Sequence, residues 1–458
     1  MQFTDPAGKV VRGHDGGMIK VGKFYYWFGV NPYASNRFRY LAVYRSTDLR
    51  TWEFRRHVLT EASAPGVANL QRPKVIYNAR TRQYVLFMRK ENHPAPLEEN
   101  RVAIATSSTV DGKYTYRRDF RPLGEASFDV SVFQDDDRNR TAYLISTTGN
   151  DQQHLTIYRL TPDYLYVAAR EHVLRNVTRE AQTLFKRNGV YFLVTSGVTG
   201  WQPNQAKYAT ATSIKGPWSA MANLGDSITY GSQPTYVLPI QGSTTTSYLY
   251  LGDRHGNAWD GNLNESEHVW LPLRFPTNRS LSMRWYPRVS IDTATGVIRG
   301  VGSSPAYEQL RARHNDQCLA IRRFTSGPIV DDDQSQGDGV GLTQRPCGTA
   351  AASNQHWQVL PVGSGFHRIV ARHSHKCLTV PASSTADNAR VTQARCGSGD
   401  NQQWKITPLA NGDHRLTARH SGKCLTIAYD PATAGPKAIQ YTCRGTANQR
   451  WKRVGAPY

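Results

Sequence analysis

Three acidic side chains, Asp15, Asp129 and Glu180, stand beside glycine or apolar residues, although a solvated surface loop is usually more polar. If a fold brought these carboxyls together, they could divide two tasks. One would stay protonated and give its proton to a leaving oxygen, and another would stay ionised and activate water. Like-charged neighbours favour this division because they raise the pKa of one member. The set indicates hydrolysis of a glycosidic bond by a base, a pKa-setting carboxylate and an acid, although each carboxylate taken singly is more often a turn cap or a structural group.

The three carboxylates belong to a short polar segment that recurs five times within residues 1–300. The copies are His14-Asp15-Gly16-Gly17, Gln71-Arg72-Pro73-Lys74, Phe128-Asp129-Val130-Ser131, Arg179-Glu180-Ala181-Gln182 and Gly231-Ser232-Gln233-Pro234. Each precedes a strand-like run centred on a tyrosine, namely Tyr25, Tyr84, Tyr143, Tyr191 or Tyr248. Turn signals separate the runs and long helical periodicity is missing, so the modules predict an all-β fold, a five-bladed β-propeller. The inner strands of a propeller surround one axis, which would bring the polar segments to a common pocket.

Other residues of these segments and of nearby loops are candidates to bind the substrate. They are His14, Gln71, Arg72, Trp201, Asn204, Gln233 and Arg254. Trp201 stands in a polar stretch after glycine, where an aromatic ring could form a pocket wall against the face of a sugar. Arg72 and Arg254 could hold sugar hydroxyls or position the carboxylates, with a structural ion pair as the equal alternative.

A second repeat occupies residues 307–458. Ala-Arg-His followed by Cys-Leu recurs three times, and each copy ends in Gln-x-Trp, with Trp357, Trp404 and Trp451 spaced by 47 residues. Copies this short cannot bury their apolar faces singly, so they should close on one another as a pseudo-threefold all-β unit around the tryptophans. We therefore interpret the glutamine and tryptophan of each Gln-x-Trp as core and turn residues in preference to ligands. Residues 301–306 are the predicted linker between the two domains.

All six cysteines lie in this second domain, at Cys318, Cys347, Cys377, Cys396, Cys424 and Cys443. An even, clustered number with one pair in each copy predicts three disulfides, and no Cys-x-x-Cys pair indicates zinc binding or thiol redox chemistry. Because disulfides form in oxidising compartments, we expect a secreted, extracellular protein. The first residues do not resemble a signal peptide, so the expectation of export depends on the cysteines.

The formal net charge of the 458 residues is +21, which makes a polyanionic partner worth considering. Lys and Arg are scattered and run no longer than adjacent pairs such as Arg55-Arg56, which disfavours nucleic acid. An anionic polysaccharide or wall surface remains an alternative to plain surface charge. The apolar runs are too short to span a bilayer. We expect a polysaccharide or oligosaccharide substrate, a monomer, and neither nucleic acid nor membrane as a partner.

The Gln-x-Trp repeats with paired cysteines resemble the ricin-B-type β-trefoil, carbohydrate-binding module family 13. This resemblance implies shallow sugar-binding pockets, usually with an Asp shortly after the first cysteine of each repeat. Here the corresponding stretches begin Cys318-Leu319-Ala320, Cys377-Leu378-Thr379 and Cys424-Leu425-Thr426, so that carboxylate is absent. Asp387 with Asn388 is the one weak candidate for sugar binding, and a purely structural trefoil is the alternative.

The first domain contains the motifs His14-Asp15-Gly16-Gly17, Arg72-Pro73-Lys74-Val75-Ile76-Tyr77-Asn78, Phe133 through Asp137, Glu180-Ala181 before Leu184-Phe185, and Tyr250-Leu251-Gly252-Asp253-Arg254. In these motifs it resembles glycoside hydrolase family 43, and within it the exo-β-1,3-galactanases. This resemblance implies hydrolysis with inversion. Asp15 falls where most members have the general base, Asp129 where they have the carboxylate that tunes and orients the acid, and Glu180 where they have the acid. Gln233 matches the glutamine that galactanases place near the nucleophilic water. Inversion would require the two working carboxyls to lie roughly 6.5 to 9.5 Å apart.

Two departures from the galactanase pattern affect the substrate. Val30 and Gln71 stand where that branch usually has glutamates, and Asp15 is present as in arabinan- and xylan-directed members. We predict a secreted, inverting exo-glycoside hydrolase acting on β-1,3-galactan or arabinogalactan. The alternatives are an α-L-arabinofuranosidase or β-D-galactofuranosidase with the same mechanism, and an inactive, lectin-like carbohydrate-binding protein. No cofactor is required; the resemblance allows a structural calcium on the propeller axis, with His255 as a neighbour, but no metal ligand set can be identified from the sequence.

Overall fold

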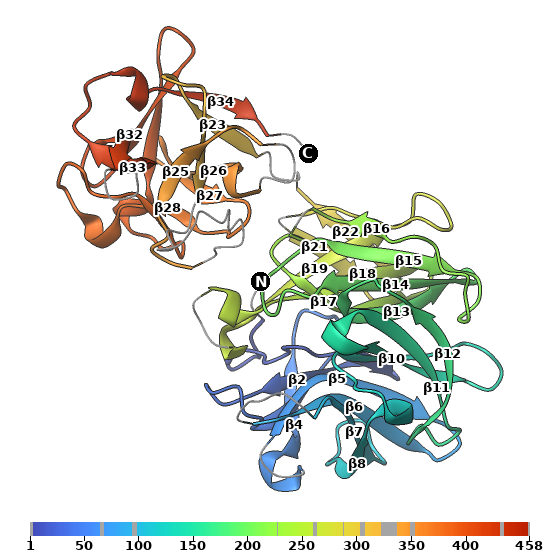
Figure 1. The fold of residues 1–458 in the computed structure, drawn as a ribbon. Helices are drawn as coiled ribbons and strands as arrows, with labels where there is room; N and C mark the ends of the chain where they lie inside the picture. Colours follow the sequence, from blue (N-terminus) through green and yellow to red (C-terminus); the bar gives the residue numbers. More distant parts are fainter. Residues whose placement is uncertain are drawn as a thin grey trace. The chain divides into compact units, whose positions relative to one another are not determined.

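The computed structural model describes residues 3–64, 68–93, 99–226, 228–259, 263–286, 288–302, 307–321, 337–348, 353–430 and 435–456. These residues form two compact units, of which the first comprises Met1–Asn257 with Gly261–Ser303 and the second Ser304–Tyr458 with Ala258–Asp260. Most of the predicted linker, residues 303–306, lies outside the described residues. Within the described ranges the chain is built of strands and short 3-10 helices, so the all-β prediction is confirmed (Figure 1).

The first unit is a five-bladed β-propeller, in which the described residues form five four-stranded antiparallel sheets. The blades are β1 (Met18–Val21), β2 (Phe24–Asn31), β3 (Tyr40–Ser46), β4 (Glu53–Thr60); β5 (Ala68–Asn78), β6 (Gln83–Asn92), β7 (Arg101–Ser107), β8 (Thr115–Phe120); β9 (Val130–Gln134), β10 (Ala142–Thr148), β11 (His154–Leu160), β12 (Val167–Leu174); β13 (Arg179–Arg187), β14 (Val190–Gly197), β15 (Ala206–Ala211), β16 (Ala222–Leu224); and β17 (Gln233–Gln241), β18 (Thr246–Arg254), β19 (Glu267–Arg274), β20 (Ser282–Met283). A two-stranded sheet, β21 (Arg288–Asp292) and β22 (Val297–Val301), follows. The predicted tyrosine runs are the second strand of each blade.

Apolar side chains between successive blades hold the ring together. Five clusters of buried residues lie one in each gap between neighbouring blades of the described structure. The cluster that closes the ring combines Trp27 and Trp52 of the first blade with Leu249 and Trp270 of the fifth. The rings of Trp27 and Trp270 lie 5.1 Å apart between centroids. Burying such large apolar surfaces is a main source of stability, so the first and last blades need no covalent link.

The polar segments lie at the beginning of the innermost strand of each blade, and their backbone is irregular there. Bulges interrupt β5 between Gln71 and Lys74, β13 between Glu180 and Thr183, and β17 between Pro234 and Tyr236. Bulges re-aim side chains and are common beside active sites. Asp15, Arg72 and Ala181 also have positive φ angles of 61°, 56° and 52°, a region that costs a non-glycine residue about 1–2 kcal/mol. These three residues of the polar segments therefore have a strained backbone, as do several non-glycine residues elsewhere in the described chain.

The second unit is a β-trefoil in which each Gln-x-Trp has the same role. Its strands are β23 (Glu308–Ala312), β24 (Cys318–Ile321), β25 (Leu342–Arg345), β26 (Trp357–Gly363), β27 (Phe366–Ala371), β28 (Cys377–Thr379), β29 (Thr392–Ala394), β30 (Trp404–Pro408), β31 (His414–Ala418), β32 (Cys424–Asp430), β33 (Gly435–Tyr441) and β34 (Trp451–Gly455). The three tryptophans share one apolar core. Each indole N–H donates to a leucine carbonyl, at 3.1, 2.9 and 3.1 Å, namely Leu319, Leu378 and Leu425. Each glutamine holds a turn; Gln402 Oε1, for example, accepts from the Gly397 amide at 2.6 Å.

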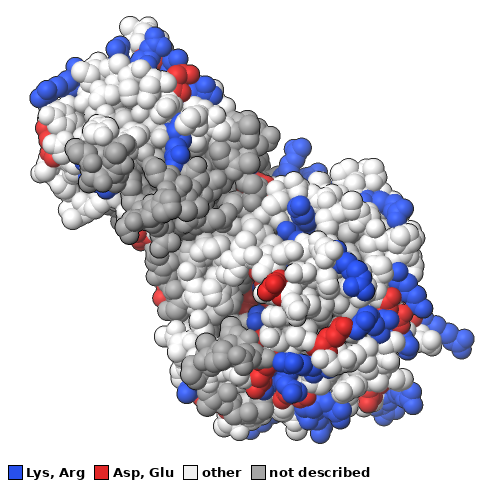
Figure 2. All heavy atoms as spheres, viewed as in Figure 1, with Lys and Arg blue, Asp and Glu red and all other residues white. Residues whose placement is uncertain are grey.

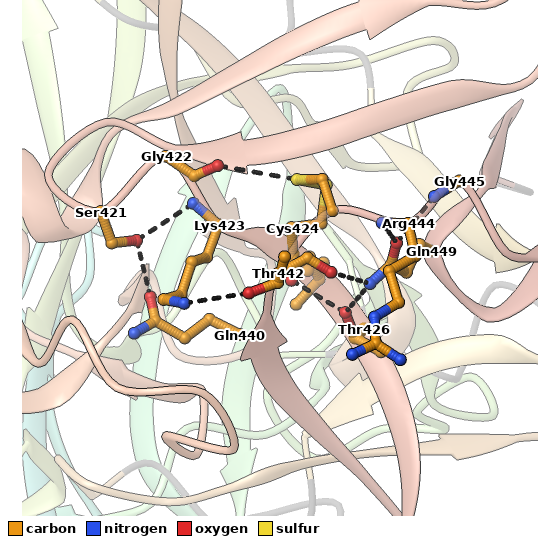
Figure 3. Close-up of a disulfide and its surroundings, with 12 residues drawn as sticks. Ser421, Gly422, Lys423, Cys424, Thr426, Gln440, Thr442, Arg444, Gly445 and Gln449 are labelled. Carbon is orange, nitrogen blue, oxygen red and sulfur yellow. Dashed lines mark hydrogen bonds between the residues drawn. A yellow bond between two sulfur atoms is a disulfide. The ribbon is translucent and has the colours of Figure 1, made fainter.

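Three disulfides confirm the predicted pairing of one bond in each repeat. They join Cys318 to Cys347, Cys377 to Cys396 and Cys424 to Cys443. Figure 3 shows the third of these bonds, with Gln449 hydrogen bonded to Thr426 and Thr442 beside it. Thr426 occupies the position where the resemblance would place a sugar-binding Asp, and here it supports the Gln-x-Trp turn.

Asp387, the weak candidate for sugar binding, forms hydrogen bonds between two repeats. Its carboxylate accepts from Lys423 Nζ at 2.6 Å and from the Thr442 amide at 2.8 Å. Asn388 has a φ of 67° and donates its amide to the Gln440 carbonyl at 3.1 Å. An equivalent pair joins Asp338 to Lys376. These contacts tie the third repeat to the second and the second to the first, a structural role that the sequence did not reveal.

Charged side chains are dispersed on the face drawn in Figure 2, where Lys and Arg stand singly or beside Asp and Glu. This view agrees with the scattered distribution of basic residues in the sequence. In the described part of the chain, no helix has the length and apolar character needed to cross a membrane.

Candidate active site

Arg72 joins two of the three predicted carboxylates. One guanidinium nitrogen, Nη1, lies 3.3 Å from Asp15 Oδ1, and the other, Nη2, lies 2.9 Å from Asp129 Oδ2. Burial alone would lower the pKa of Arg72, but the carboxylates of Asp129, Asp15 and Glu180 raise it, so the side chain stays charged. Arg72 therefore joins three of the five polar segments, those of Asp15, Asp129 and Arg72 itself.

Asp15 is held by its backbone and presents an ionised carboxylate. Its amide donates to Asp253 Oδ2 at 2.6 Å, and its carbonyl accepts from Lys74 Nζ at 2.9 Å. Burial would raise the pKa of Asp15, but Arg72 and the smaller contributions of neighbouring basic groups together outweigh it, so the pKa lies below its usual range. Both carboxylate oxygens are buried without a hydrogen bond from any described residue. Buried acceptors normally find partners, so this carboxylate is suited to accept from a water or a substrate hydroxyl.

Asp129 is tied to the two residues that follow Glu180. Its Oδ2 accepts from the Ala181 amide at 3.0 Å, and its backbone carbonyl accepts from Gln182 Nε2 at 2.6 Å. Its Oδ1 lies 3.5 Å from Nη1 of Arg89, a cation that the sequence analysis did not single out. Asp129 therefore holds the backbone that follows Glu180 in the neighbouring blade, and its charge acts on the Glu180 carboxyl.

Glu180 is protonated at neutral pH in this site. Its side chain is buried, and burial together with the charge of Asp129 raises its pKa to about 8. Arg72, Arg89 and the backbone amide of Thr199 act in the opposite direction without reversing the shift. A protonated Glu180 together with an ionised Asp15 is the division of states that acid and base catalysis needs.

The loop that follows β14 carries Trp201 and accepts hydrogen bonds from Gln233 on β17. Gln233 donates both Nε2 protons to this loop, to the Gly200 carbonyl at 2.7 Å and to the Gln202 carbonyl at 2.8 Å. Its Oε1 is buried without a partner among the described residues, so the free group of this amide is an acceptor. The half-buried Trp201 ring packs against His255, with centroids 5.0 Å apart.

The end of β18 and the residue that follows it contribute Asp253 and His255, to which the sequence assigned no role in binding or catalysis. His255 Nδ1 is hydrogen bonded to His14 Nε2 at 2.9 Å, and Asp253 Oδ1 to His268 Nδ1 at 2.7 Å. Burial and the neighbouring His14 lower the pKa of His255 to about 3, so it is neutral. Alternation along a strand places Asp253 and His255 on one side and Arg254 on the other, and this pattern was the signal that could have identified them.

Three of the predicted substrate-binding residues contact protein groups outside the cluster of Asp15, Arg72 and Asp129. Arg254 donates to the Tyr230 carbonyl at 2.9 Å and lies 3.8 Å from Glu267, which matches the alternative of a structural ion pair. Asn204 is hydrogen bonded within its own loop. Gln71 is half-buried opposite Arg89 in the β5–β6 pair.

The side chains His14, Asp15, Asp253 and His255 lie close enough to be considered as metal ligands. Calcium takes six to eight oxygen ligands. Both oxygens of Asp253 are already hydrogen bonded, which leaves the two oxygens of Asp15 and otherwise imidazole nitrogens. Arg72 and Lys74, two basic groups, also adjoin Asp15. This donor set does not fit a calcium ion held by protein atoms.

Comparison with known proteins agrees with the geometry. The family model "Glycosyl hydrolases family 43" matches residues 9–230, and "Ricin-type beta-trefoil lectin domain-like" matches residues 304–394, 353–435 and 400–457. No curated protein is similar enough in sequence to count as a match.

Three solved structures illustrate the similarity. An exo-beta-1,3-galactanase from Clostridium thermocellum is 38% identical with a TM-score of 0.65, and the alignment covers 100% of this chain and 98% of that one. A putative exo-beta-1,3-galactanase from Bifidobacterium bifidum is 28% identical, with a TM-score of 0.57 over 64% of this chain and 98% of that one. An exo-beta-1,3-galactanase from Phanerochaete chrysosporium, solved with beta-1,3-galactotriose, is 25% identical, with a TM-score of 0.62 over 99% and 98%. The chain belongs to glycosyl hydrolases family 43 and is a glycoside hydrolase with a C-terminal ricin-type β-trefoil domain.

Proposed function

We propose that this glycoside hydrolase removes galactose from the ends of β-1,3-linked galactan by an inverting mechanism, with Glu180 as general acid and Asp15 as general base. The observation that carries the proposal is the buried cluster that these two carboxyls form with Arg72 and Asp129, in which their pKa values are shifted in opposite directions. The pKa of Glu180 is raised to about 8 by burial and Asp129, whereas Arg72 keeps that of Asp15 low. Similarity over the full chain to the Clostridium thermocellum enzyme supports the choice of galactan.

In the proposed reaction a water molecule attacks the anomeric carbon from the face opposite the leaving group. Asp15 takes a proton from this water while the new carbon–oxygen bond forms. Glu180 gives its proton to the glycosidic oxygen, so that the old carbon–oxygen bond breaks and a neutral alcohol leaves. Asp129 raises the pKa of Glu180, and Arg72 favours the ionised form of Asp15. Gln233 Oε1 accepts a hydrogen bond from the water. Proton exchange with solvent then restores both carboxyls.

A furanoside is the second candidate substrate, because Val30 and Gln71 stand where the galactanase branch usually has glutamates. Val30 is buried in the apolar cluster between the first two blades, so a polar substrate contact from this position is lost. An α-L-arabinofuranosidase or β-D-galactofuranosidase would use the same acid and base.

The deciding experiment is sugar release from β-1,3-galactan and from arabinan by the wild type and by Glu180→Gln. Galactose release that the substitution abolishes supports the proposal. Arabinose release, or activity on furanosides alone, would keep the mechanism and replace the substrate. If the wild type released no sugar from any glycoside and still bound galactan, the chain would be an inactive carbohydrate-binding member of the family.

We also propose that the protein is secreted, acts as a monomer and needs no metal. The three disulfides support export, since such bonds persist in oxidising compartments. The donor set around Asp15, which does not fit calcium, supports hydrolysis without that ion. The neutral imidazole of His255 would instead bind water or a substrate hydroxyl.

A further inference from the structure

The loop from Gly197 to Asn204, which joins β14 to β15, contacts several parts of the site. Hereafter it is called the 197–204 loop. The backbone amide of Thr199 faces the Glu180 carboxyl closely enough to favour its ionised form and lower its pKa. The ring of Trp201 packs on His255. The loop thus touches the candidate acid on β13 and a histidine that follows β18.

The same loop fixes the orientation of the Gln233 side chain. Two of its carbonyls, those of Gly200 and Gln202, accept both Nε2 protons of Gln233. An amide whose N–H groups are both engaged can offer only its oxygen to a ligand. If these carbonyls moved, Gln233 could rotate and present a donor where the water requires an acceptor.

One side chain holds the base of the loop. Asn204 Oδ1 accepts from the Gly197 amide at 2.6 Å. Asn204 Nδ2 donates to Thr199 Oγ1 at 2.7 Å and lies 3.1 Å from the Gly197 carbonyl. Thr199 Oγ1 in turn donates to the Gln202 carbonyl at 2.6 Å. The first and last residues of the loop are therefore joined through Asn204, and the contact continues through Thr199 to Gln202.

We propose that Asn204 is a positioning residue, which orders the 197–204 loop so that Glu180 and Gln233 are held in their reactive orientations. Asn204 makes no contact with the candidate acid itself and acts through Thr199, Gly200 and Gln202. The inference rests on the proposed function, since it assigns a purpose to the loop only if Glu180 and Gln233 take part in hydrolysis. The sequence predicted that Asn204 binds substrate; the positioning role is proposed from the hydrogen bonds that its side chain makes within the loop.

The test uses the full-length protein and the variants Asn204→Ala, Asn204→Asp and Thr199→Val, with Thr199→Ser as the conservative partner. Asn223→Ala is the matched control, because Asn223 is exposed on β16 of the same blade. Hydrogen exchange of the peptide spanning residues 198–204 measures the order of the loop without reference to activity. The kinetic measurements are kcat, KM and the pH profile on the substrate found for the wild type.

We expect faster exchange in the loop and a fall in kcat of up to about 100-fold in Asn204→Ala, with a smaller change in KM. The alkaline limb of the pH profile should move to higher pH, because the Thr199 amide no longer favours ionised Glu180. Asn204→Asp keeps the acceptor and loses the donor, so it should resemble Asn204→Ala at the Thr199 end of the loop. Thr199→Ser should retain most activity and Thr199→Val should not.

Two results would overturn the inference. One is unchanged loop exchange in Asn204→Ala; the other is faster exchange with kcat and the pH profile unaltered. If Asn204→Ala fails to fold, the comparison of Thr199→Val with Thr199→Ser decides in the same way. A wild type that releases no sugar would instead refute the proposed function, and the exchange data would still report whether Asn204 orders the loop.

Discussion

Arg72 Nη2 and Asp129 Oδ2 lie 2.9 Å apart, and both side chains are buried. The pair acts on the protonation of both candidate catalytic carboxyls. Asp129 raises the pKa of Glu180, and Arg72 lowers it while keeping Asp15 ionised. The separate protonation states of Glu180 and Asp15 therefore depend on a cation placed between carboxylates.

The pH dependence of kcat/KM should follow the proton of Glu180. The acid works only when protonated and its pKa is about 8, so activity should be level at neutral pH and fall about tenfold per pH unit well above 8. Asp15 stays ionised into acid, so its titration should not limit activity near neutral pH. A profile that falls between pH 5 and 6 instead would contradict the assignment of a raised pKa to the acid.

Asp129→Asn should move this alkaline limb to lower pH. Removing a negative charge beside Glu180 removes one cause of its raised pKa, and Arg72 and Arg89 then favour the ionised form; a neighbouring charge is worth about 1–3 pH units. The measurement is the pH profile of the variant beside that of Asp136→Asn. Asp136 is 73% exposed and serves as the control. A limb displaced to higher pH would show that Asp129 acts in another way.

Asp15→Asn should lower kcat by about 10²–10⁴-fold, the contribution typical of a general base. Gln233→Ala should cost less, because an amide oxygen orients water without taking its proton. Steady-state rates of the two variants on the same substrate give the comparison, and NMR of the first product anomer reports inversion. A larger loss for Gln233→Ala than for Asp15→Asn would assign the water to Gln233.

Chelation by EDTA should leave the rate and the thermal stability unchanged. The prediction follows from the ligands near Asp15, which include hydrogen-bonded Asp253 oxygens and adjoining Arg72 and Lys74. Rates and Tm measured before and after dialysis against the chelator, with calcium added back, provide the check. Loss of activity that calcium restores would refute the metal-free proposal.

Trp404→Ala should destabilise the trefoil by about 3–5 kcal/mol, the cost of truncating a large buried aromatic side chain. Trp404 is fully buried in the threefold core and its indole N–H is hydrogen bonded to Leu378. Urea unfolding followed by circular dichroism measures the change. Leu360→Ala, at a residue that is 38% exposed, is the control and should have little effect.

Repeats allowed much of the architecture to be predicted from the sequence. Five tyrosine runs and three Gln-x-Trp motifs each describe a local unit, and units that cannot bury their faces alone must pack on one another. The fold class and the disulfide pairing within repeats follow from this rule. The segments that hold Asp15, Asp129 and Glu180 were found in the same way, since they recur at the same place in every module.

The sequence by itself determined the two repeat architectures, the family resemblance and the polar segments from which the site is built. The tertiary structure alone decided which side chains of those segments face one another. Asp253 and His255 lie in the site and Arg254 does not, because a strand sends successive side chains to opposite sides. The raised pKa of Glu180 likewise depends on burial and on the distance to Asp129, and both arise only when separate blades close around one axis.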